Sequence, residues 1–393
     1  MSTQKRTIGV VFGSRSVEHD VSIVTAQQVM KALRPERYDV VPIYITRDGR
    51  WLTGPALRDI QSFQSDAIAE RMDVQDAIIS PSTQHHGLII NPVSGLFGRS
   101  RAQRLDVVFP VMHGTHGEDG TLQGLLEMAD LPFVGANTMT SAVARDKIML
   151  KTVLAQNNLP VVPHIAVTRP DWVAAPDEIL AHIAKELGYP VFIKPASLGS
   201  SIGIGRAANA DEARNYINIA ANFDRRILIE TALPDVIEIN CALLGYRDLR
   251  PSVLEQPISW QEFLTYEEKY MRSEGAAGMK GAERKIPAPL PDEMTTRIQE
   301  MAVAAFQAVD GCGTARVDFL LQGDTIYVNE INTLPGSFAF YLWQEEGMSP
   351  SDVVEALVEL AMEAHAEKRK TVYNYKTGLL AHAAARGLKG IKK

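Results

Sequence analysis

The sequence predicts an α/β protein whose first third forms a parallel sheet. Three observations support this fold class. Short apolar runs alternate with helical patterns, the chain has 393 residues, and 46% of them are hydrophobic. A chain of this length forms roughly two or three domains. With 22% charged residues, the composition is that of a globular protein and not of a disordered one.

Elements of the first third follow from apolar runs and their spacing. Strands are expected where a short apolar run is bounded by turn residues, at residues 8–12, 40–45 and 105–110. Helices are expected where apolar residues recur at helical spacing, at residues 21–30 and about 120–129. Residues 57–100 are polar with weak periodicity, so an insertion or a mobile loop region is expected there.

The remaining chain continues with mixed elements. Helices are expected at residues 141–156, within 171–187, and at 210–221, 291–309 and 349–365. Strands are expected at residues 191–194, 227–230, 238–244, 315–321 and 325–330. The tail at residues 367–393 carries eight basic residues against the single acid Glu367. It is interpreted as a solvated, flexible C-terminus, with contact to an anionic partner or a second subunit as the alternative.

Charge and cysteine usage exclude several classes. The net charge of −7 gives no basic field for a nucleic-acid partner. The two cysteines, Cys241 and Cys312, lie in no Cys/His cluster, so a zinc site is unsupported and reduced, cytosolic usage is indicated, although one disulfide stays open. No apolar stretch approaches the ~20 residues of a membrane helix. A soluble, cytoplasmic protein without a membrane contact is therefore expected.

Oxygen-bearing side chains near the end of two expected strands indicate a metal site. Glu330 and Asn332 are two residues apart on one strand and share a face, and Asp318 can join them from the neighbouring strand. Such hard oxygen ligands suit Mg²⁺, which bridges nucleotide phosphates. Arg316, two residues before Asp318, faces the same side and can stabilise developing negative charge. The alternative is a strand pair with surface acids and one salt bridge.

Further segments indicate a nucleotide site. A strand ends at Lys194, and a small-residue loop with Ser200 and Ser201 follows, whose backbone N–H groups could close over an anion. A flexible hairpin turn is the alternative, since no P-loop or dinucleotide fingerprint is present. The segment from Glu230 to Leu233 could bind an adenine edge, and Glu238 could accept ribose hydroxyls. Lys147, in a helical stretch, adds a cation that could equally be a surface charge.

Together these positions resemble the ATP-grasp superfamily in order and spacing and, more narrowly, the D-alanine–D-alanine ligase family. The most specific matches are FGSRSVEHDVS at residues 12–22, HGTHGEDGTLQG at 113–124 and YEEKY at 266–270. The resemblance covers roughly residues 8–366. It implies an ATP-grasp fold with an N-terminal, Rossmann-like parallel-sheet domain. It divides the chain into an N-terminal substrate domain (1–138), a central ATP-grasp domain (139–232), a C-terminal catalytic domain (233–366) and the basic tail (367–393).

The resemblance also implies a role for each matching residue. The ATP-binding positions are Lys147, Lys194, Ser200, Ser201, Glu230, Leu233, Glu238 and Lys269, with Glu230 at the adenine amino group and Glu238 at the ribose. The ligands of two Mg²⁺ ions, which Mn²⁺ could replace, are Asp318, Glu330 and Asn332. The residues at the first substrate and at the reacting group are Glu18, His113, Ser200, Tyr270, Arg316 and the backbone N–H of Gly336.

The reaction implied by this resemblance joins two D-alanines for peptidoglycan precursor synthesis. The carboxylate of the first attacks ATP, and the amine of the second attacks the resulting acyl phosphate. Tyr270 fits a dipeptide product better than a D-lactate ester. The resemblance also makes a homodimer plausible. A related ligase that takes D-serine or D-lactate as second substrate stays open, and so does a non-catalytic nucleotide-binding protein, whereas the missing dinucleotide fingerprint disfavours a dehydrogenase.

The sequence departs from the family pattern after Gly336. It continues SFAFYLW where the family has a stretch rich in threonine and serine. By ungapped spacing, Tyr341 stands where a family serine lies near the carboxylate of the second substrate, and Ser337 is the only serine nearby. Both are therefore candidate substrate-binding residues, and aromatic side chains could narrow or reshape the second pocket.

Overall fold

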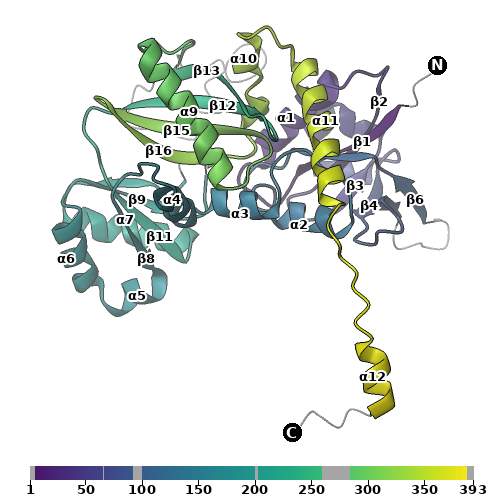
Figure 1. Cartoon of the computed structure of the whole chain (residues 1–393), viewed down its shortest axis with the longest axis horizontal. Coiled ribbons are helices and arrows are strands. Elements are labelled where there is room, and N and C mark those ends of the chain that lie inside the picture. The colour runs from purple at the N-terminus through teal and green to yellow at the C-terminus, as the bar shows by residue number, and fades with distance from the viewer. Residues whose placement is uncertain (1–4, 65, 92–99, 200–201, 259–283, 387–393) are drawn as a thin grey trace.

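The computed structural model describes residues 5–64, 66–91, 100–199, 202–258 and 284–386 (Figure 1). Within these residues the strands form three sheets of seven, four and five strands. The three sheets follow one another along the chain. The α/β class expected from the alternating pattern is confirmed.

The seven-stranded sheet lies in the N-terminal part. Its order is β6-β5-β4-β3-β2-β1-β7. The strands are β1 (Arg6–Gly13), β2 (Tyr38–Ile45), β3 (Trp51–Thr53), β4 (Gln75–Ile79), β5 (Gly87–Ile90), β6 (Arg101–Arg104) and β7 (Val107–Pro110). Strand β1 pairs in parallel with β2 and with β7, as predicted, while β3 to β6 add in antiparallel fashion. Helix α1 (His19–Ala32) connects β1 to β2, and α2 (Thr121–Met128) follows β7.

Of the two alternatives for residues 57–100, the mobile loop region is wrong for the part that the structure describes, and the insertion stays a prediction. After the short helices η1 (Pro55–Arg58), η2 (Ile60–Phe63) and η3 (Asp66–Glu70), the chain enters β4 and β5. These strands have only five and four residues, too few for a clear alternating pattern. They are nevertheless anchored by buried Ala77, Ile79, Leu88 and Ile90.

The central sheet has the order β10-β9-β11-β8 and is antiparallel throughout. Its strands are β8 (His164–Thr168), β9 (Val191–Pro195), β10 (Gly205–Ala207) and β11 (Arg226–Thr231). Its helices are α5 (Arg169–Ala174), α6 (Pro176–Glu186) and α7 (Ala210–Phe223). Before it, the single helix expected at 141–156 is broken at Asp146 into α3 (Thr138–Arg145) and α4 (Lys147–Gln156). The extended Asp146 accepts N–H bonds from Ile148 and Met149 and so starts the second helix.

The third sheet has the order β14-β13-β12-β15-β16. Its strands are β12 (Ile237–Gly245), β13 (Arg250–Pro257), β14 (Arg284–Lys285), β15 (Gly313–Gln322) and β16 (Thr325–Asn332), and α9 (Asp292–Ala308) packs on it. The chain then forms η4 (Gly336–Ala339), α10 (Phe340–Gln344), α11 (Pro350–Lys368) and α12 (Leu379–Arg386).

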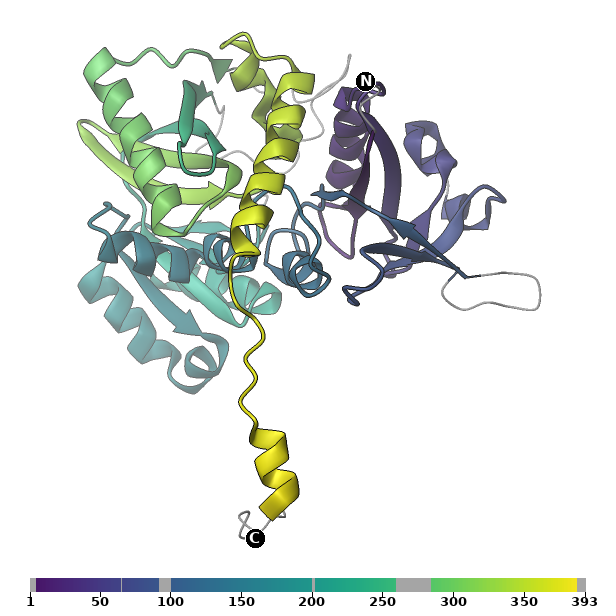
Figure 2. The same ribbon diagram turned by 45° about the vertical axis from the view of Figure 1, so that its right-hand side comes forward.

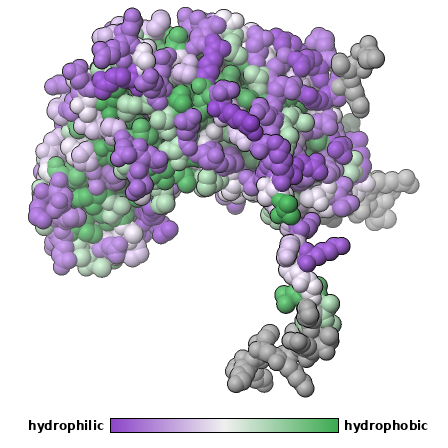
Figure 3. Space-filling model, viewed as in Figure 1, coloured by the Kyte–Doolittle hydropathy of each residue, from purple (hydrophilic) through white to green (hydrophobic). Residues whose placement is uncertain are grey.

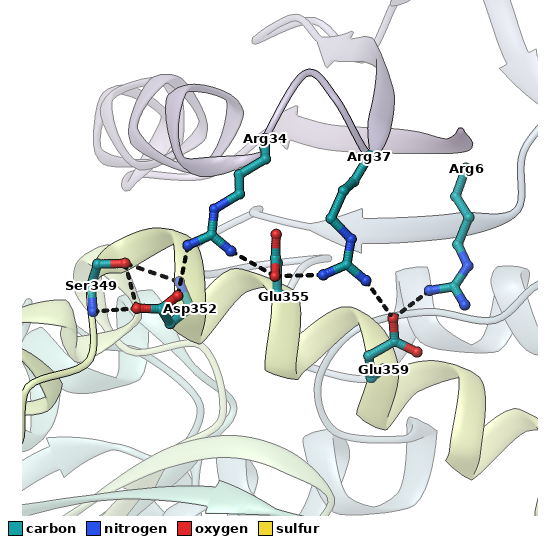
Figure 4. A network of polar contacts seen from close by, with 7 residues as sticks. All are labelled: Arg6, Arg34, Arg37, Ser349, Asp352, Glu355 and Glu359. Atoms are coloured by element: carbon teal, nitrogen blue, oxygen red, sulfur yellow. Dashed lines mark hydrogen bonds and ion pairs between the residues drawn. The ribbon is translucent and has the colours of Figure 1, made fainter. Parts of the chain in front are cut away.

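Helix α11 is packed against the N-terminal part of the chain (Figures 1 and 2). Its buried Val354 and Leu357 belong to the same hydrophobic cluster as Ile8 of β1 and Val29 of α1. A row of ion pairs borders this contact (Figure 4). It joins Arg34 to Asp352 and Glu355, Arg37 to Glu355 and Glu359, and Arg6 to Glu359, at distances of 2.5 to 3.5 Å.

Glu355 is the most enclosed acid of this row, and its replacement tests the contact. Arg34 and Arg37 each place a guanidinium nitrogen 2.7 Å from Glu355 Oε2, and only 13% of the Glu355 side chain is exposed. Glu355→Ala is expected to lower the free energy of unfolding by about 1 kcal/mol, because two partly exposed arginines lose their shared partner. Urea denaturation measures this value. Asp39→Ala, which removes an exposed pair at 3.8 Å, is the control and should change it little.

The described tail leaves the body after α11 (Figures 1 to 3). Val372, Tyr373, Tyr375, Leu379 and Leu380 are exposed along it. Removal of residues 372–393 is therefore expected to leave the melting temperature and the turnover rate unchanged. A drop in either would show that the tail packs on a partner. None of the helices in the described ranges is both long and apolar enough to cross a lipid bilayer.

Candidate active site

One cavity brings residues of the four-stranded and five-stranded sheets together with residues that follow β1 and β7 of the N-terminal sheet. Most of the predicted site residues in the described ranges line it: Glu18, His113, Lys147, Lys194, Glu230, Leu233, Glu238, Arg316, Asp318, Glu330, Asn332, Gly336 and Tyr341. Ser337 is not among the lining residues. Ser200, Ser201, Lys269 and Tyr270 fall outside the described residues.

The pairing of β15 with β16 builds the acidic end of the cavity. Asp318 stands opposite Glu330, and Arg316 stands opposite Asn332. Arg316 donates from Nε and Nη2 to the two carboxylate oxygens of Asp318, at 2.6 and 2.7 Å. Asn332 Nδ2 donates to Asp318 Oδ2 at 3.1 Å. Arg316 and Asp318 thus share a face, as their spacing predicts.

This acidic end has the chemistry of a divalent-cation site. Asp318, Glu330 and Asn332 supply carboxylate and amide oxygens, the donors that Mg²⁺ prefers. Burial raises the pKa of Asp318 to about 6. The charges of Glu330 and Glu238 add to this rise, and Arg316 opposes it. A bound cation would offset the repulsion between these neighbouring carboxylates. The residues therefore fit the metal that the sequence pattern indicates.

A buried charge cluster lies where β9 and β11 meet α4. Glu230 is 2% exposed, and its carboxylate pairs with Lys194 and, at 2.5 Å, with Lys151 Nζ. Although burial opposes the shift, the two lysines lower the pKa of Glu230 to about 2. Glu230 also raises the pKa of Lys194 against the effect of burial. Glu230 and Lys194 are therefore charged at neutral pH.

Lys151 is absent from the predicted site. The available signal was its position four residues after Lys147 on one helix, which places both side chains on the same face. Its 1% exposure shows that it is no surface lysine.

Lys147 also reaches into the cavity and is not the surface charge that a helical lysine usually is. Its Nζ donates to the backbone oxygen of Leu198 at 2.6 Å and lies 4.0 Å from Glu330 Oε2. Its backbone N–H donates to Ala196. Burial lowers the pKa of Lys147 to about 8, with Glu330 opposing the shift. Helix α4 therefore fastens the segment after Lys194 and presents a cation beside the acidic end.

A second group of charges stands at the start of α1. Arg145 Nη1 donates to Glu118 Oε2 at 2.6 Å, and Arg145 Nη2 lies 3.9 Å from Glu18 Oε2. His113 Nδ1 lies 3.5 Å from Glu118 Oε1, and its Nε2 is 3.1 Å from Thr25 Oγ1. Neither Glu118, within the motif at residues 113–124, nor Arg145, within the expected helix at 141–156, is among the predicted site residues. This group could orient the ammonium and carboxylate of an amino acid.

Gly114 shows how closely the backbone approaches Glu18. A Cβ added there would lie 2.6 Å from Glu18 Oε2, and the residue has φ +78°. Glycine fits this position because it has no Cβ and tolerates a left-handed conformation. The turn after β7 and the start of α1 thereby form one wall of the cavity.

The turn after Gly336 explains the positions of the two candidate residues for the second substrate. Ser337, Phe338 and Ala339 all have φ near +50°. This turn directs Phe338 into the core, where its ring centroid lies 5.1 Å from that of Phe109. Gly336 and Tyr341 stay at the cavity, while Ser337 does not line it. An ungapped count along the sequence could not foresee three consecutive left-handed residues.

The fold and the site define an ATP-dependent ligase. Lys147 and Lys194 line the cavity near its acidic end, and Arg316, Gly336 and Glu18 line the same cavity. The family models for the N-terminus and the C-terminus of D-ala D-ala ligase match residues 7–136 and 153–359. The chain belongs to the D-alanine–D-alanine ligase family.

Known relatives cover almost the whole chain. The D-alanine–D-alanine ligase of Geobacillus thermodenitrificans is 38% identical over 378 residues, which are 94% of this chain and 99% of the relative. The solved D-alanine–D-alanine ligase of Coxiella burnetii has a TM-score of 0.79 at 28% identity, covering 98% and 99% of the two chains. The solved VanG D-Ala:D-Ser ligase of Enterococcus faecalis has a TM-score of 0.78 at 29% identity, covering 91% and 100%.

Proposed function

We propose that this protein joins two D-alanines into D-alanyl-D-alanine with the hydrolysis of ATP to ADP, as a step in peptidoglycan precursor synthesis. One observation carries the proposal: a single cavity unites the Glu18–Arg145 pair with Lys147, Lys194 and the Arg316–Asp318 pair. The family membership and the near-complete coverage of relatives that bear this name support it.

In the first half of the proposed reaction, the carboxylate of one D-alanine attacks the γ-phosphate of ATP. Glu18 holds the ammonium group of that D-alanine, and Lys147 and Lys194 hold phosphate oxygens. Asp318, Glu330 and Asn332 would hold Mg²⁺, which neutralises developing charge on the phosphates. Positioning and charge dominate this step, so no protein nucleophile is required. Glu238, Leu233 and Glu230 are proposed to border the nucleoside.

In the second half, the amine of the other D-alanine attacks the acyl phosphate carbon. Arg316 and the backbone N–H of Gly336 are proposed to stabilise the oxyanion of the tetrahedral intermediate, after which phosphate leaves. Partial burial of both partners of the Arg316–Asp318 pair strengthens this effect, because charge interactions are less screened away from water.

The direct test is phosphate release from ATP and Mg²⁺ with D-alanine as the only amino acid, with the product identified by mass spectrometry. A D-alanyl-D-alanine mass that accumulates with phosphate is the expected result. The likeness to a D-Ala:D-Ser ligase, together with Tyr341 at the second pocket, favours one alternative. If turnover requires added D-serine or D-lactate, the ligase chemistry stands and the second substrate changes.

Removal of the metal is expected to abolish turnover. With excess chelator, phosphate release with D-alanine should fall to background and return when Mg²⁺ or Mn²⁺ is added. Glu330→Gln should raise the Mg²⁺ concentration needed for half-maximal rate by about tenfold, since one of the charged ligands becomes neutral. Glu293→Gln, on the exposed first turn of α9, is the matched control and should leave that concentration unchanged.

The remaining expectations of location, assembly and domain division are part of the same proposal. Both cysteines are free and buried, which is consistent with a reducing cytoplasm. A homodimer and the boundaries at residues 138, 232 and 366 stay predictions. Light scattering tests the first, and limited proteolysis the second.

A further inference from the structure

We propose that Arg284 binds the carboxylate of the second amino acid, and that Glu255 and Tyr341 hold Arg284 in place for this purpose. The inference rests on the proposed function and deepens it, because it assigns a substrate group to a residue that neither the sequence pattern nor the comparisons single out. All three residues line the same cavity as Arg316 and Gly336.

Glu255 is the anchor of this group. It lies on β13 and is 3% exposed. Both of its oxygens are engaged. Oε2 accepts from the Tyr341 hydroxyl at 2.5 Å and from Asn240 Nδ2 at 3.1 Å, and Oε1 lies 3.2 Å from Arg284 Nη1. Burial and the charge of Glu255 raise the pKa of Tyr341, so its hydroxyl remains a donor. Protein groups thus engage both oxygens of Glu255, and Glu255 holds the side chains of Tyr341 and Arg284 in place.

Arg284 is held from two directions. Its guanidinium carbon lies 4.6 Å from the centroid of the Tyr341 ring, within the range of a cation–π contact, and Nη1 meets Glu255. The Arg284 side chain is 22% exposed, against 4% for Glu255, so the cation is the more accessible member of the pair. A planar, permanently charged guanidinium held in this manner is well suited to bind a carboxylate.

The positions of the other cations leave this task to Arg284. Five arginines and lysines of the described residues line the cavity: Arg145, Lys147, Lys194, Arg284 and Arg316. Arg145 lies at Glu118 and Glu18, where the first amino acid is proposed to bind, the two lysines are assigned to the phosphates, and Arg316 is assigned to the oxyanion. A second amino acid must place its amine near Arg316 and Gly336 and its carboxylate a few ångströms away. Tyr341, whose ring Arg284 contacts, lines the same cavity as Arg316.

Competition between two acceptors tests the proposal. D-Alaninamide has no carboxylate to activate, so it can enter only as the second substrate. With ATP, Mg²⁺ and equal D-alanine and D-alaninamide, the full-length wild type is expected to make mainly D-alanyl-D-alanine. Arg284→Gln should shift the product ratio towards the dipeptide amide by about tenfold. The substitution removes the contact between Arg284 and the D-alanine carboxylate, and D-alaninamide has no carboxylate to make that contact. Mass spectrometry reads both products.

Matched variants separate this role from a structural one. Lys285→Gln changes the adjacent, exposed residue on the same short strand and should keep the wild-type ratio. Arg284→Lys keeps a cation and should recover part of the preference for D-alanine. Tyr341→Phe keeps the ring but removes the donor to Glu255, so it should raise KM for the acceptor more than it lowers kcat.

An unchanged product ratio in Arg284→Gln overturns the proposal, provided that the variant still forms the amide product, which reports a folded enzyme. If Arg284→Gln forms neither product, an unchanged ratio in Arg284→Lys and Tyr341→Phe decides against it in the same way. Failure of the proposed function looks different, because the wild type itself would then make no dipeptide from D-alanine.

Discussion

Arg316→Ala is expected to lower kcat by about 10²- to 10³-fold, the loss seen when one donor to a developing oxyanion is removed. Arg316 is partly buried at the cavity wall and makes two hydrogen bonds to Asp318, so its guanidinium is held in place before the reaction begins. The tetrahedral oxyanion carries more negative charge than the acyl phosphate carbonyl. The variant should therefore lose transition-state binding and change KM for ATP far less.

Steady-state phosphate release with D-alanine measures this loss. Arg316→Lys is an informative companion, because it keeps the charge but cannot bond both oxygens of Asp318, and an intermediate kcat is expected. Arg297→Ala, on helix α9, is a control outside the residues that line the cavity and should retain wild-type kcat. A kcat for Arg316→Ala within about threefold of wild type would contradict the assigned role.

Lys151→Met is expected to lower the free energy of unfolding by about 3 kcal/mol, because it removes one partner of a buried ion pair. Glu230 is paired with two lysines in the described residues, and only Lys194 would remain after the substitution. Methionine preserves most of the buried volume of lysine, so the loss reflects charge and not a cavity. Urea denaturation provides the measurement, and Lys185→Met, with a side chain that is 80% exposed, is the control.

The difference in free energy of unfolding between wild type and Lys151→Met should depend on pH, because the pKa of Glu230 is lowered in the folded protein. Glu230 has its pKa lowered from 4.5 to about 2 in the folded protein. A depressed carboxyl pKa stabilises the fold above its unfolded value and loses that contribution as the pH falls through the folded value. The gap between wild type and Lys151→Met should therefore be full at neutral pH and shrink as the pH falls from 4.5 towards 2. A gap that is independent of pH in this range would show that Lys151 stabilises the fold by packing alone.

The parts of the fold that could be predicted are those with strong local periodicity. Strands such as β9 and β11 are apolar runs with clear ends, and the parallel pairing of β1 with β2 follows from the helix between them. Strands β4 and β5 could not be predicted, because their short burial patterns depend on pairing with each other. The break at Asp146 was missed for a related reason, since the apolar spacing continues through it.

For the site, short-range spacing was informative and long-range contact was not. Arg316 and Asp318 share a strand face, so their proximity could be predicted. Glu255 and Arg284 lie 29 positions apart, with undescribed residues between them, and only the pairing of β13 with β14 brings them together. The contact of Lys151 with Glu230 could not be predicted without knowing that α4 faces Glu230. A buried charge is recognised by its partner, and the partner is set by the tertiary structure.

The contact of α11 with the N-terminal part has a consequence for synthesis on the ribosome. Arg6 and Glu359 are 353 positions apart, yet they meet at 2.5 Å, and Leu357 completes a cluster that begins at Ile8. The N-terminal sheet emerges early, but one side of its core stays uncovered until the end of α11 has left the exit tunnel. Chains released from the ribosome that stop before residue 350 should thus be more sensitive to protease within residues 5–64 than released chains that extend to residue 386. This part of the molecule is among the first to be made and among the last to be completed.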